Sequence, residues 1–232
     1  MKKIIIIPAF NEEKNIGRVL TSVQEHCPGF DILVVNDGSA DRTSEKAREF
    51  SQVRVIDLPI NLGIGGAVQT GFLYSQRKGY GLAIQIDGDG QHRPDEVPKI
   101  LAPIQRGEAD VVIGSRFLEK ASYRSGLFRK IGIKAFEIAN RLLLGERITD
   151  STSGFRAFNR KAIDVLSRNY PDDYPEPEAL YILKKRGLRI LEVPVLMETR
   201  SHGKSSISFL RSLYYMVKVF LAIFVLMLRK TE

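Results

Sequence analysis

The first half of the chain alternates short runs of β-branched residues with helical patterns, and no other feature of the sequence restricts the fold as strongly. The runs that predict strands lie at residues 3–7, 32–35, 53–58, 82–86 and 111–114. A stripe at helical spacing follows the first run and consists of Ile16, Val19, Leu20 and Val23. Asn11 is the candidate N-cap of that helix, and a second helix follows the glycine-rich turn that begins at Asn61. Such alternation predicts an α/β fold with a mostly parallel central sheet flanked by helices.

Length and composition fit one globular domain with a short extension. The 232 residues correspond to about 1.5 domains of about 150 residues each. With 44% hydrophobic and 27% charged residues, the chain is neither disordered nor of low complexity. Cys27 is the only cysteine, which excludes an internal disulfide framework and a cysteine-rich metal site. The apolar run near Met1 is too short for a secretory signal, so we expect the chain to face a reducing cytoplasm.

Basic residues concentrate in one apolar stretch. The formal charge is +8, and residues 116–147 hold eight basic side chains against three acidic ones, beside many Ile, Leu and Phe residues. Nucleic-acid surfaces interleave basic residues with exposed aromatics or glycines, whereas basic residues beside aliphatic ones are typical of a membrane surface. We therefore expect this stretch to contact anionic lipid and not nucleic acid.

Two polar loops follow the first two predicted strands. They run through residues 8–12 and 36–41, and in an open α/β sheet the loops at the carboxyl ends of the strands bind the ligand. Asp37 can accept N–H donors from a nucleobase, while Asn11 and Glu12 open a helix whose free amides suit ribose or phosphate. A helix cap and a plain turn would explain either loop alone, but two such loops side by side favour a nucleotide site.

The glycine-rich turn does not match a dinucleotide-binding fingerprint. Gly63, Gly65 and Gly66 are followed by Val68 where the last glycine of that motif belongs, and the turn follows the third strand instead of the first. These glycines are expected to let the backbone approach a ligand or to let a helix pack closely on the sheet.

An apolar strand runs directly into two carboxylates at residues 84–92. Asp87 and Asp89 point to the same side of an extended segment and repel each other unless a cation lies between them. Oxygen ligands, with Gln91 nearby, suit Mg²⁺ or Mn²⁺ better than zinc. A solvated polar loop is the simpler alternative. An EF-hand would need glycine in place of His92 and glutamate in place of Pro98. A phosphatase of the haloacid dehalogenase type has a similar strand and carboxylate pair and stays a weaker alternative, because it usually has Thr or Val where this chain has Gln91.

The sequence resembles the family 2 glycosyltransferases of GT-A fold, especially the branch of dolichyl-phosphate mannose synthases and bacterial polyprenyl-phosphate glycosyltransferases. The resemblance spans residues 3 to 207. Its motifs, in chain order, are IIPAFNEE, VVNDGSADRT, NLGIGGAVQTGF, QIDGDGQHRPDE, IGSRF, DSTSGFRAF and RSHGKSSIS. Family members of this type invert the anomeric centre by a single displacement.

The resemblance implies roles for individual residues. The residues that would bind the nucleotide-sugar donor are Pro8, Ala9, Asn11, Glu12, Asp37, Gly66 and Asp87. A divalent ion, Mg²⁺ or Mn²⁺, would be held by Asp87, Asp89 and Gln91. The residues that would bind the donor diphosphate or the acceptor phosphate are Arg116, Arg124, Arg129, Arg200, Lys204 and Ser205. The catalytic candidates are Asp89, Arg116, Glu176 and Glu178.

The acceptor decides whether a base is needed. An alcohol needs one, whereas a phosphate monoester with a second pKa near 6 is already ionised at pH 7. Relatives that act on alcohols carry the base in a Glu-Asp pair, and this chain departs from that pattern with Glu176 and Glu178 in a Pro-Glu-Pro-Glu segment. Either glutamate could act as base, orient the sugar or bind acceptor, or place acid at a helix start, where the dipole favours it.

Two further helices are expected beside the membrane. Residues 126–145 form an amphipathic pattern that could lie among lipid headgroups, with a core helix as the alternative. Residues 213–228 contain Lys218 as their only charge and would measure about 24 Å at about 1.5 Å per residue, short of a bilayer core of about 30 Å. An interfacial helix is therefore favoured over a helix that packs against an integral membrane partner or a second copy of the chain, and over a span. The expected division is a GT-A domain at 1–207 and a C-terminal helix at 208–232.

The sequence thus predicts a metal-dependent inverting glycosyltransferase on the cytoplasmic face of the membrane. It would move sugar from a nucleotide donor, with UDP slightly favoured over GDP, to a polyprenyl phosphate. A glycosyltransferase with a hydroxyl acceptor and a catalytically silent nucleotide-sugar-binding subunit of a membrane complex are the alternatives.

Overall fold

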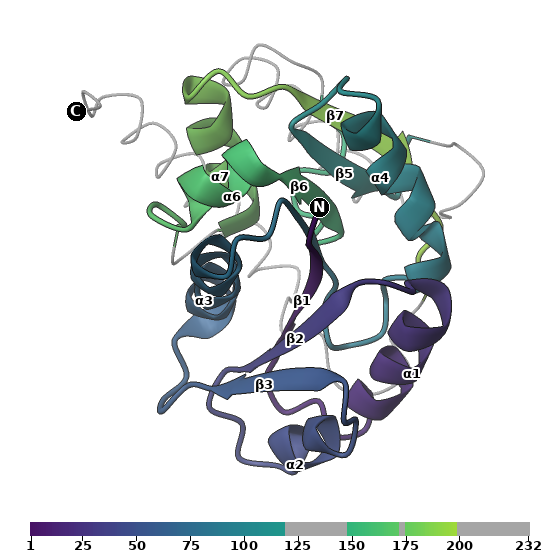
Figure 1. Ribbon diagram of the computed structural model, residues 1–232, viewed down its shortest axis with the longest axis vertical. Helices are drawn as coiled ribbons and strands as arrows, with labels where there is room; N and C mark the ends of the chain where they lie inside the picture. Colours follow the sequence, from purple (N-terminus) through teal and green to yellow (C-terminus); the bar gives the residue numbers. More distant parts are fainter. Residues whose placement is uncertain (119–147, 172–174, 199–232) are drawn as a thin grey trace, which may run out of the picture.

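The protein forms a twisted sheet with helices on both faces, seen here in a computed structural model that describes residues 1–118, 148–171 and 175–198 (Figure 1). The described strands are β1 (Lys3–Ala9), β2 (Asp31–Asn36), β3 (Val53–Asp57), β4 (Leu82–Gln85), β5 (Val111–Ser115), β6 (Arg156–Asn159) and β7 (Ile190–Pro194). The described helices are α1 (Ile16–His26), α2 (Thr43–Arg48), α3 (Gly63–Arg77), α4 (Val97–Gln105), α6 (Arg160–Leu166) and α7 (Pro175–Lys185), with a 3-10 turn at Pro94–Glu96.

The strand order is β3-β2-β1-β4-β6-β5-β7. β6 runs antiparallel to both of its neighbours, and the other pairs are parallel. This confirms the predicted α/β fold with a mostly parallel sheet. The five strands predicted in the first half of the chain are present to within two residues at either end.

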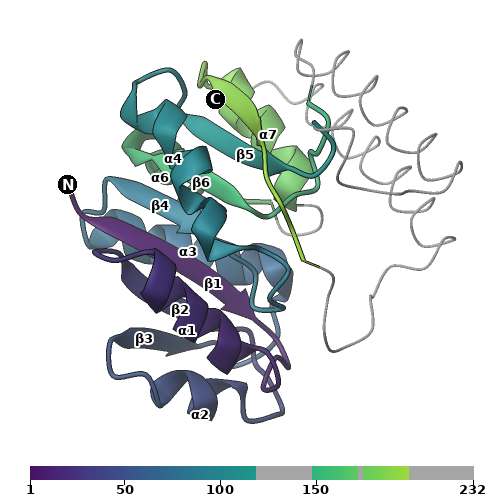
Figure 2. The same cartoon turned by 90° about the vertical axis from the view of Figure 1, so that its right-hand side faces the viewer.

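Two apolar cores lie on opposite faces of the sheet. One is closed by α1, α2 and α4, and the other by α3, α6 and α7, as the arrangement of the helices in Figures 1 and 2 shows. The predicted stripe of α1 is fully buried. Burial raises the pKa of the Cys27 thiol, just beyond α1, to about 12, with the nearby charge of Asp95 as a smaller cause.

Several expectations fall on residues outside the described ranges. They are the helices at 126–145 and 213–228 and the boundary between 207 and 208. Among the helices that the structure does describe, none has the length and apolarity needed to cross a bilayer.

Close packing of α3 against β1 depends on Gly71. A Cβ at this position would lie 2.3 Å from Cγ2 of the buried Ile6, whereas a Cβ on Gly17 of α1 would have no neighbour within 4 Å. Gly71 lies inside α3 and is not among the glycines, Gly63, Gly65 and Gly66, for which close packing on the sheet is predicted from the sequence.

We expect Gly71→Ala to lower the free energy of unfolding by about 1–3 kcal/mol, the usual cost of overpacking a core. Gly17→Ala, the matched control, should raise it by up to about 1 kcal/mol because alanine favours a helix over glycine. Urea denaturation of both variants measures these effects. Equal effects of the same sign would contradict the packing role of Gly71.

Candidate active site

Three polar loops meet at one edge of the sheet, because β1 lies between β2 and β4 and all three run in the same direction. The Asp37 N–H donates to the Ala9 carbonyl at 2.9 Å, and the Gly88 N–H to the Pro8 carbonyl at 3.2 Å. Pro8 and Ala9, both predicted to bind donor, therefore lie between the loops after β2 and β4.

The first two loops are cross-linked by their side chains. Asn11, with φ of 55°, donates its backbone N–H to Ser39 Oγ at 2.9 Å and accepts the Ala40 N–H on Oδ1 at 2.9 Å. The Glu12 N–H donates to Thr43 Oγ1 at 2.8 Å. These contacts make the two loops one unit on which a ligand could rest.

Asn11 was expected to cap α1, and that prediction is wrong. The helix begins at Ile16, and the Glu12 carbonyl accepts the backbone N–H groups of Asn15 and Ile16. A turn is inserted between the end of β1 and the helix, so the Asn11 side chain bonds within the loops instead. The buried Glu12 carboxylate accepts the Asn15 side-chain amide at 2.6 Å.

Asp37 fixes the glycine-rich turn beneath the loops. Its Oδ1 accepts the Leu62 N–H at 2.7 Å, and its carbonyl accepts the Asn61 side-chain amide at 3.2 Å. The neighbouring Gly38, at φ of +67°, has no room for a Cβ, which would lie 2.7 Å from the Asn61 backbone nitrogen. Gly66 lies in the first turn of α3, where a Cβ would lie 2.5 Å from Cβ of Leu62, the residue before the helix. The nucleobase contact of Asp37 stays a prediction.

His92 holds the first carboxylate of the pair in place. The Asp87 N–H donates to His92 Nδ1 at 3.0 Å, so in the neutral ring the proton is on Nε2, which lies 3.6 Å from Asp87 Oδ2. The imidazole is buried and stacks on Phe155 with ring centroids 5.1 Å apart. His92 is not among the site residues predicted from the sequence, where it only argues against an EF-hand. Its position five residues after Asp87 is the signal that could have revealed this contact.

The second carboxylate closes a tight turn. Asp89 Oδ1 accepts the Gln91 N–H at 3.0 Å, and the Gln91 side-chain amide donates to the Glu198 carbonyl at 3.4 Å. Within the described ranges, no three His, Cys, Asp or Glu side chains form a group that could hold a metal ion.

The residues around Asp87 nonetheless suit a hard cation. The Asp87 side chain is 34% exposed, and a Cβ on Gly154 would lie 2.9 Å from each of its carboxylate oxygens. Any side chain at 154 would therefore occupy space directly against the carboxylate. Two carboxylates and an amide oxygen are the donor types that Mg²⁺ and Mn²⁺ prefer.

Arg116, just after β5, is anchored by a buried carboxylate. Its Nε and Nη2 donate to the two oxygens of Asp150 at 2.7 and 2.8 Å, the two-pronged geometry that fixes a guanidinium most firmly. Asp150 is 1% exposed, and its N–H donates to Glu192 Oε1 of β7 at 2.7 Å. Neither Asp150 nor Glu192 was predicted from the sequence. The aspartate that opens the DSTSGF motif was the available signal.

Arg156 connects the DSTSGF loop to α7. Its guanidinium is 1% exposed and donates to the carbonyls of Ser151, Ser153 and Glu176 at 2.7, 2.7 and 2.8 Å. This arginine was not predicted from the sequence either. Three carbonyl partners satisfy the buried cation and fix the first turn of α7.

Glu176 lies where its charge interacts with that of Asp87. Burial raises the pKa of Glu176 to about 6, with Arg156 acting in the opposite direction and Asp87 adding to the increase. Burial and the charge of Glu176 also raise the pKa of Tyr170. Glu178 is buried on the same helix. The predicted phosphate-binding residues Arg124, Arg129, Arg200, Lys204 and Ser205 lie outside the described ranges.

The profile of the family "Glycosyl transferase family 2" matches residues 4–166. The chain belongs to glycosyl transferase family 2. Polyprenol monophosphomannose synthase of Mycolicibacterium smegmatis is 31% identical over 216 residues, covering 89% of this chain and 81% of the relative. The UDP-N-acetylglucosamine--dolichyl-phosphate N-acetylglucosaminyltransferase of Methanococcus voltae is 36% identical over 211 residues, with 82% and 83% covered.

Solved structures of glucosyl-3-phosphoglycerate synthase from Mycobacterium tuberculosis share the fold. One aligns with a TM-score of 0.72 at 22% identity and covers 96% of this chain and 79% of that one. Another, which contains Mn²⁺, uridine diphosphate and glucosyl-3-phosphoglycerate, has a TM-score of 0.70 at 21% identity, with 97% and 78% covered. This family 2 chain is thus a glycosyltransferase of GT-A fold, as the sequence motifs predicted.

The raised pKa of Glu176 predicts a pH-dependent stability. The carboxyl titrates near 4.5 when unfolded and near 6 when folded, so its contribution is fully present below pH 4.5 and is lost as pH rises through 6. Because glutamine cannot ionise, the melting temperature of Glu176→Gln should rise relative to that of the unaltered chain between pH 4.5 and 7.

Thermal melts across this pH range measure the difference. Glu108→Gln is the control, because Arg106 lowers the pKa of that exposed carboxyl. The difference in melting temperature between Glu108→Gln and the unaltered chain should therefore stay constant from pH 5 to 7. A flat difference for Glu176→Gln as well would show that the pKa of its carboxyl is not raised in the folded protein.

Proposed function

We propose that this glycosyltransferase moves a sugar from a nucleoside diphosphate donor to a polyprenyl phosphate at the cytoplasmic face of the membrane, with inversion. The observation that carries the proposal is the position of Asp87, whose partly exposed carboxylate lies beside the linked loops after β1 and β2 and against Gly154. Relatives at 31% and 36% identity are named for polyprenol and dolichyl phosphate acceptors, which supports the choice of acceptor.

The donor nucleoside would lie on the linked loops after β1 and β2. Pro8, Ala9, Asn11 and Glu12 would line it on one side and Asp37 on the other, with Gly66 in the turn below. UDP is favoured over GDP because uridine diphosphate occupies the structural neighbour and the Methanococcus voltae relative is named for a UDP-sugar.

Asp87, Asp89 and Gln91 would hold Mg²⁺ or Mn²⁺ at the donor diphosphate. When bound, such an ion supplies positive charge that stabilises the departing nucleoside diphosphate. His92 orients the Asp87 backbone, and the turn closed by Asp89 keeps the second carboxylate on the same loop. The Mn²⁺ and Mg²⁺ complexes of the structural neighbour support this assignment.

The acceptor phosphate would attack without help from a base, because its second pKa near 6 leaves it ionised at pH 7. Arg116, held in a fixed direction by Asp150, would present positive charge to a phosphate. Arg124, Arg129, Arg200, Lys204 and Ser205 would complete the phosphate contacts. In this reaction Glu176 and Glu178 would orient the sugar or the acceptor.

One observation favours a hydroxyl acceptor as the second candidate. The Glu176 carboxyl has a pKa of about 6 and interacts with the charge of Asp87. A carboxylate with such a pKa is mostly ionised at pH 7 and is well matched to accept a proton from an alcohol.

A transfer assay distinguishes these reactions. The full chain is incubated with Mn²⁺ and a panel of nucleotide sugars, with and without undecaprenyl phosphate, and the lipid product is measured by mass spectrometry. We expect one donor to give a lipid-linked monosaccharide. Asp89→Ala should reduce the rate at least a hundredfold, whereas Asp95→Ala, which removes an exposed carboxylate paired with Arg93, should leave it unchanged.

The Glu176→Gln variant serves as the second arm of this assay. A phosphate acceptor predicts a rate within about tenfold of the unaltered chain, because general base catalysis of about 10²–10⁴ is not involved. The opposite result would be transfer to a sugar hydroxyl, no lipid product, and loss of that transfer in Glu176→Gln. It would refute the phosphate acceptor and favour the second candidate. Equal activity of Asp89→Ala would refute the metal assignment.

Membrane association would come from the basic stretch at 116–147 and the apolar segment 213–228. We expect the full chain to sediment with vesicles that contain 30% phosphatidylglycerol, and a chain ending at Ser212 to lose at least half of that binding. Removal of Thr231 and Glu232 alone, which leaves the apolar segment whole, is the control. Undiminished binding after truncation at Ser212 would refute the role of the segment as an anchor.

A further inference from the structure

The structure contains a polar hollow at the end of the sheet opposite the candidate active site. It has a volume of about 530 Å³ and lies between the starting ends of β1 and β2, the edge strand β3 and the end of α3. We call it the amino-end pocket, and the residues that define it are Lys2, Asp31, Arg54, Tyr74, Lys78 and Tyr80. Such a volume is in the range of small-molecule sites.

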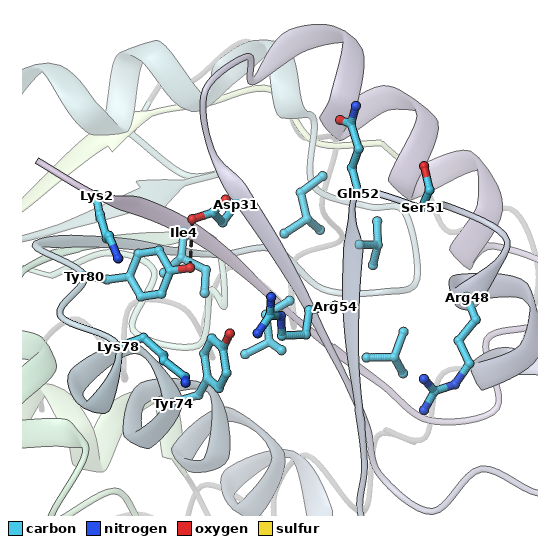
Figure 3. Close-up of a pocket in the computed structure, with 14 residues that line it drawn as sticks. Lys2, Ile4, Asp31, Arg48, Ser51, Gln52, Arg54, Tyr74, Lys78 and Tyr80 are labelled. Atoms are coloured by element: carbon cyan, nitrogen blue, oxygen red, sulfur yellow. Dashed lines mark hydrogen bonds between the residues drawn. The ribbon is translucent and has the colours of Figure 1, made fainter.

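Three cations from separate elements face this space. Figure 3 shows the amino groups of Lys2 and Lys78 and the guanidinium of Arg54 directed into it, around the hydroxyls of Tyr74 and Tyr80. The helix dipole explains a lysine at the end of α3, but it does not explain Lys2 before β1 or Arg54 on β3.

The charges of these three cations are not matched by carboxylates. Many described arginines pair with an acid, as Arg48 at the far side of the pocket does with Asp57. Lys2, Arg54 and Lys78 form no ion pair with any described Asp or Glu.

The acid of the pocket is already engaged by a phenol. Asp31 Oδ2 accepts the Tyr80 hydroxyl at 2.8 Å, and burial together with this carboxylate raises the pKa of Tyr80. Arg54 lies over the ring of Tyr74, 5.8 Å from its centroid, which fixes the guanidinium at the wall of the pocket. The pocket therefore presents an excess of positive charge around a polar space, and an anion would offset the mutual repulsion of its cations.

We propose that the amino-end pocket is a second binding site, which takes a soluble compound bearing a phosphate or diphosphate group. A phosphate carries close to two negative charges at pH 7 and several acceptor oxygens, which match two ammonium groups and a guanidinium. The site is separate from the donor site, because β1 spans six residue steps from Lys3 to Ala9, about 20 Å at about 3.3 Å per step.

The choice of a soluble compound over a lipid headgroup rests on the proposed function. A lipid acceptor must reach the carboxyl end of the sheet, where Asp87 and Asp89 lie. The amino-end pocket is at the other end of the same strands, so it faces away from a bilayer that meets the active site.

Calorimetric titration with inorganic pyrophosphate tests the site. The full-length Asp89→Ala chain is used without metal ions, nucleotide sugar or lipid, so that the result does not depend on the transfer reaction. We expect saturable binding at 150 mM salt that weakens at least tenfold when Arg54→Ala and Lys78→Ala are combined. Arg77→Ala with Arg168→Ala, which removes two arginines outside the pocket, is the control of equal charge and should bind as before.

Each alternative result refutes the proposal in a different way. An equal loss in the control pair would mean that binding follows net charge alone, and the absence of saturable binding would mean that the pocket holds no phosphate. The double variant Arg54→Ala, Lys78→Ala is also tested for sedimentation with anionic vesicles. If it loses vesicle binding but keeps pyrophosphate binding, the pocket binds a lipid headgroup, and the proposal of a soluble ligand is refuted. Circular dichroism and thermal melts of both double variants confirm that they fold.

Discussion

Four consecutive isoleucines in β1 join the two halves of the core. Ile4 and Ile6 pack in the core closed by α3, whereas Ile5 and Ile7 pack in the core closed by α1 and α4, and none is more than 1% exposed. Because both faces of β1 are apolar, both must be covered by helices, and the strand lies inside the sheet, between β2 and β4. Its position between β2 and β4 brings three polar loops to one edge, so the candidate active site depends on this burial.

Buried charges support the far side of the site. Arg156 and Asp150 are each 1% exposed, and their hydrogen bonds connect the DSTSGF loop to α7, to Arg116 and to Glu192 of β7. Charges buried in this way are costly to leave without partners, so removal of one side chain would leave another group unsatisfied. These hydrogen bonds position the loop so that Gly154 lies next to Asp87.

The first half of the fold could be predicted from the sequence because its strands are short runs rich in β-branched residues, most of them buried on both faces, that alternate with amphipathic helices. β6 and β7 could not, since each places a charged residue inside the strand, and the charges are satisfied by Glu176, 20 residues from Arg156, and by Thr149 and Asp150, more than 40 residues from Glu192. Asp87 and Asp89 were recognisable because they follow a buried strand directly. Asp150 and Arg156 bond to Arg116 and Glu176, 34 and 20 residues away, so the spacing of residues within their own motif does not reveal these partners.

The burial of Cys27 has a practical consequence for chemical labelling. It is the only cysteine of the chain, it is buried, and its pKa of about 12 leaves almost no thiolate at neutral pH. Maleimides and spin-label reagents react with the thiolate, and a buried thiol in apolar surroundings is inert. A single cysteine introduced on the surface would therefore react selectively in the folded protein, so probes can be attached to this glycosyltransferase without first replacing its native thiol.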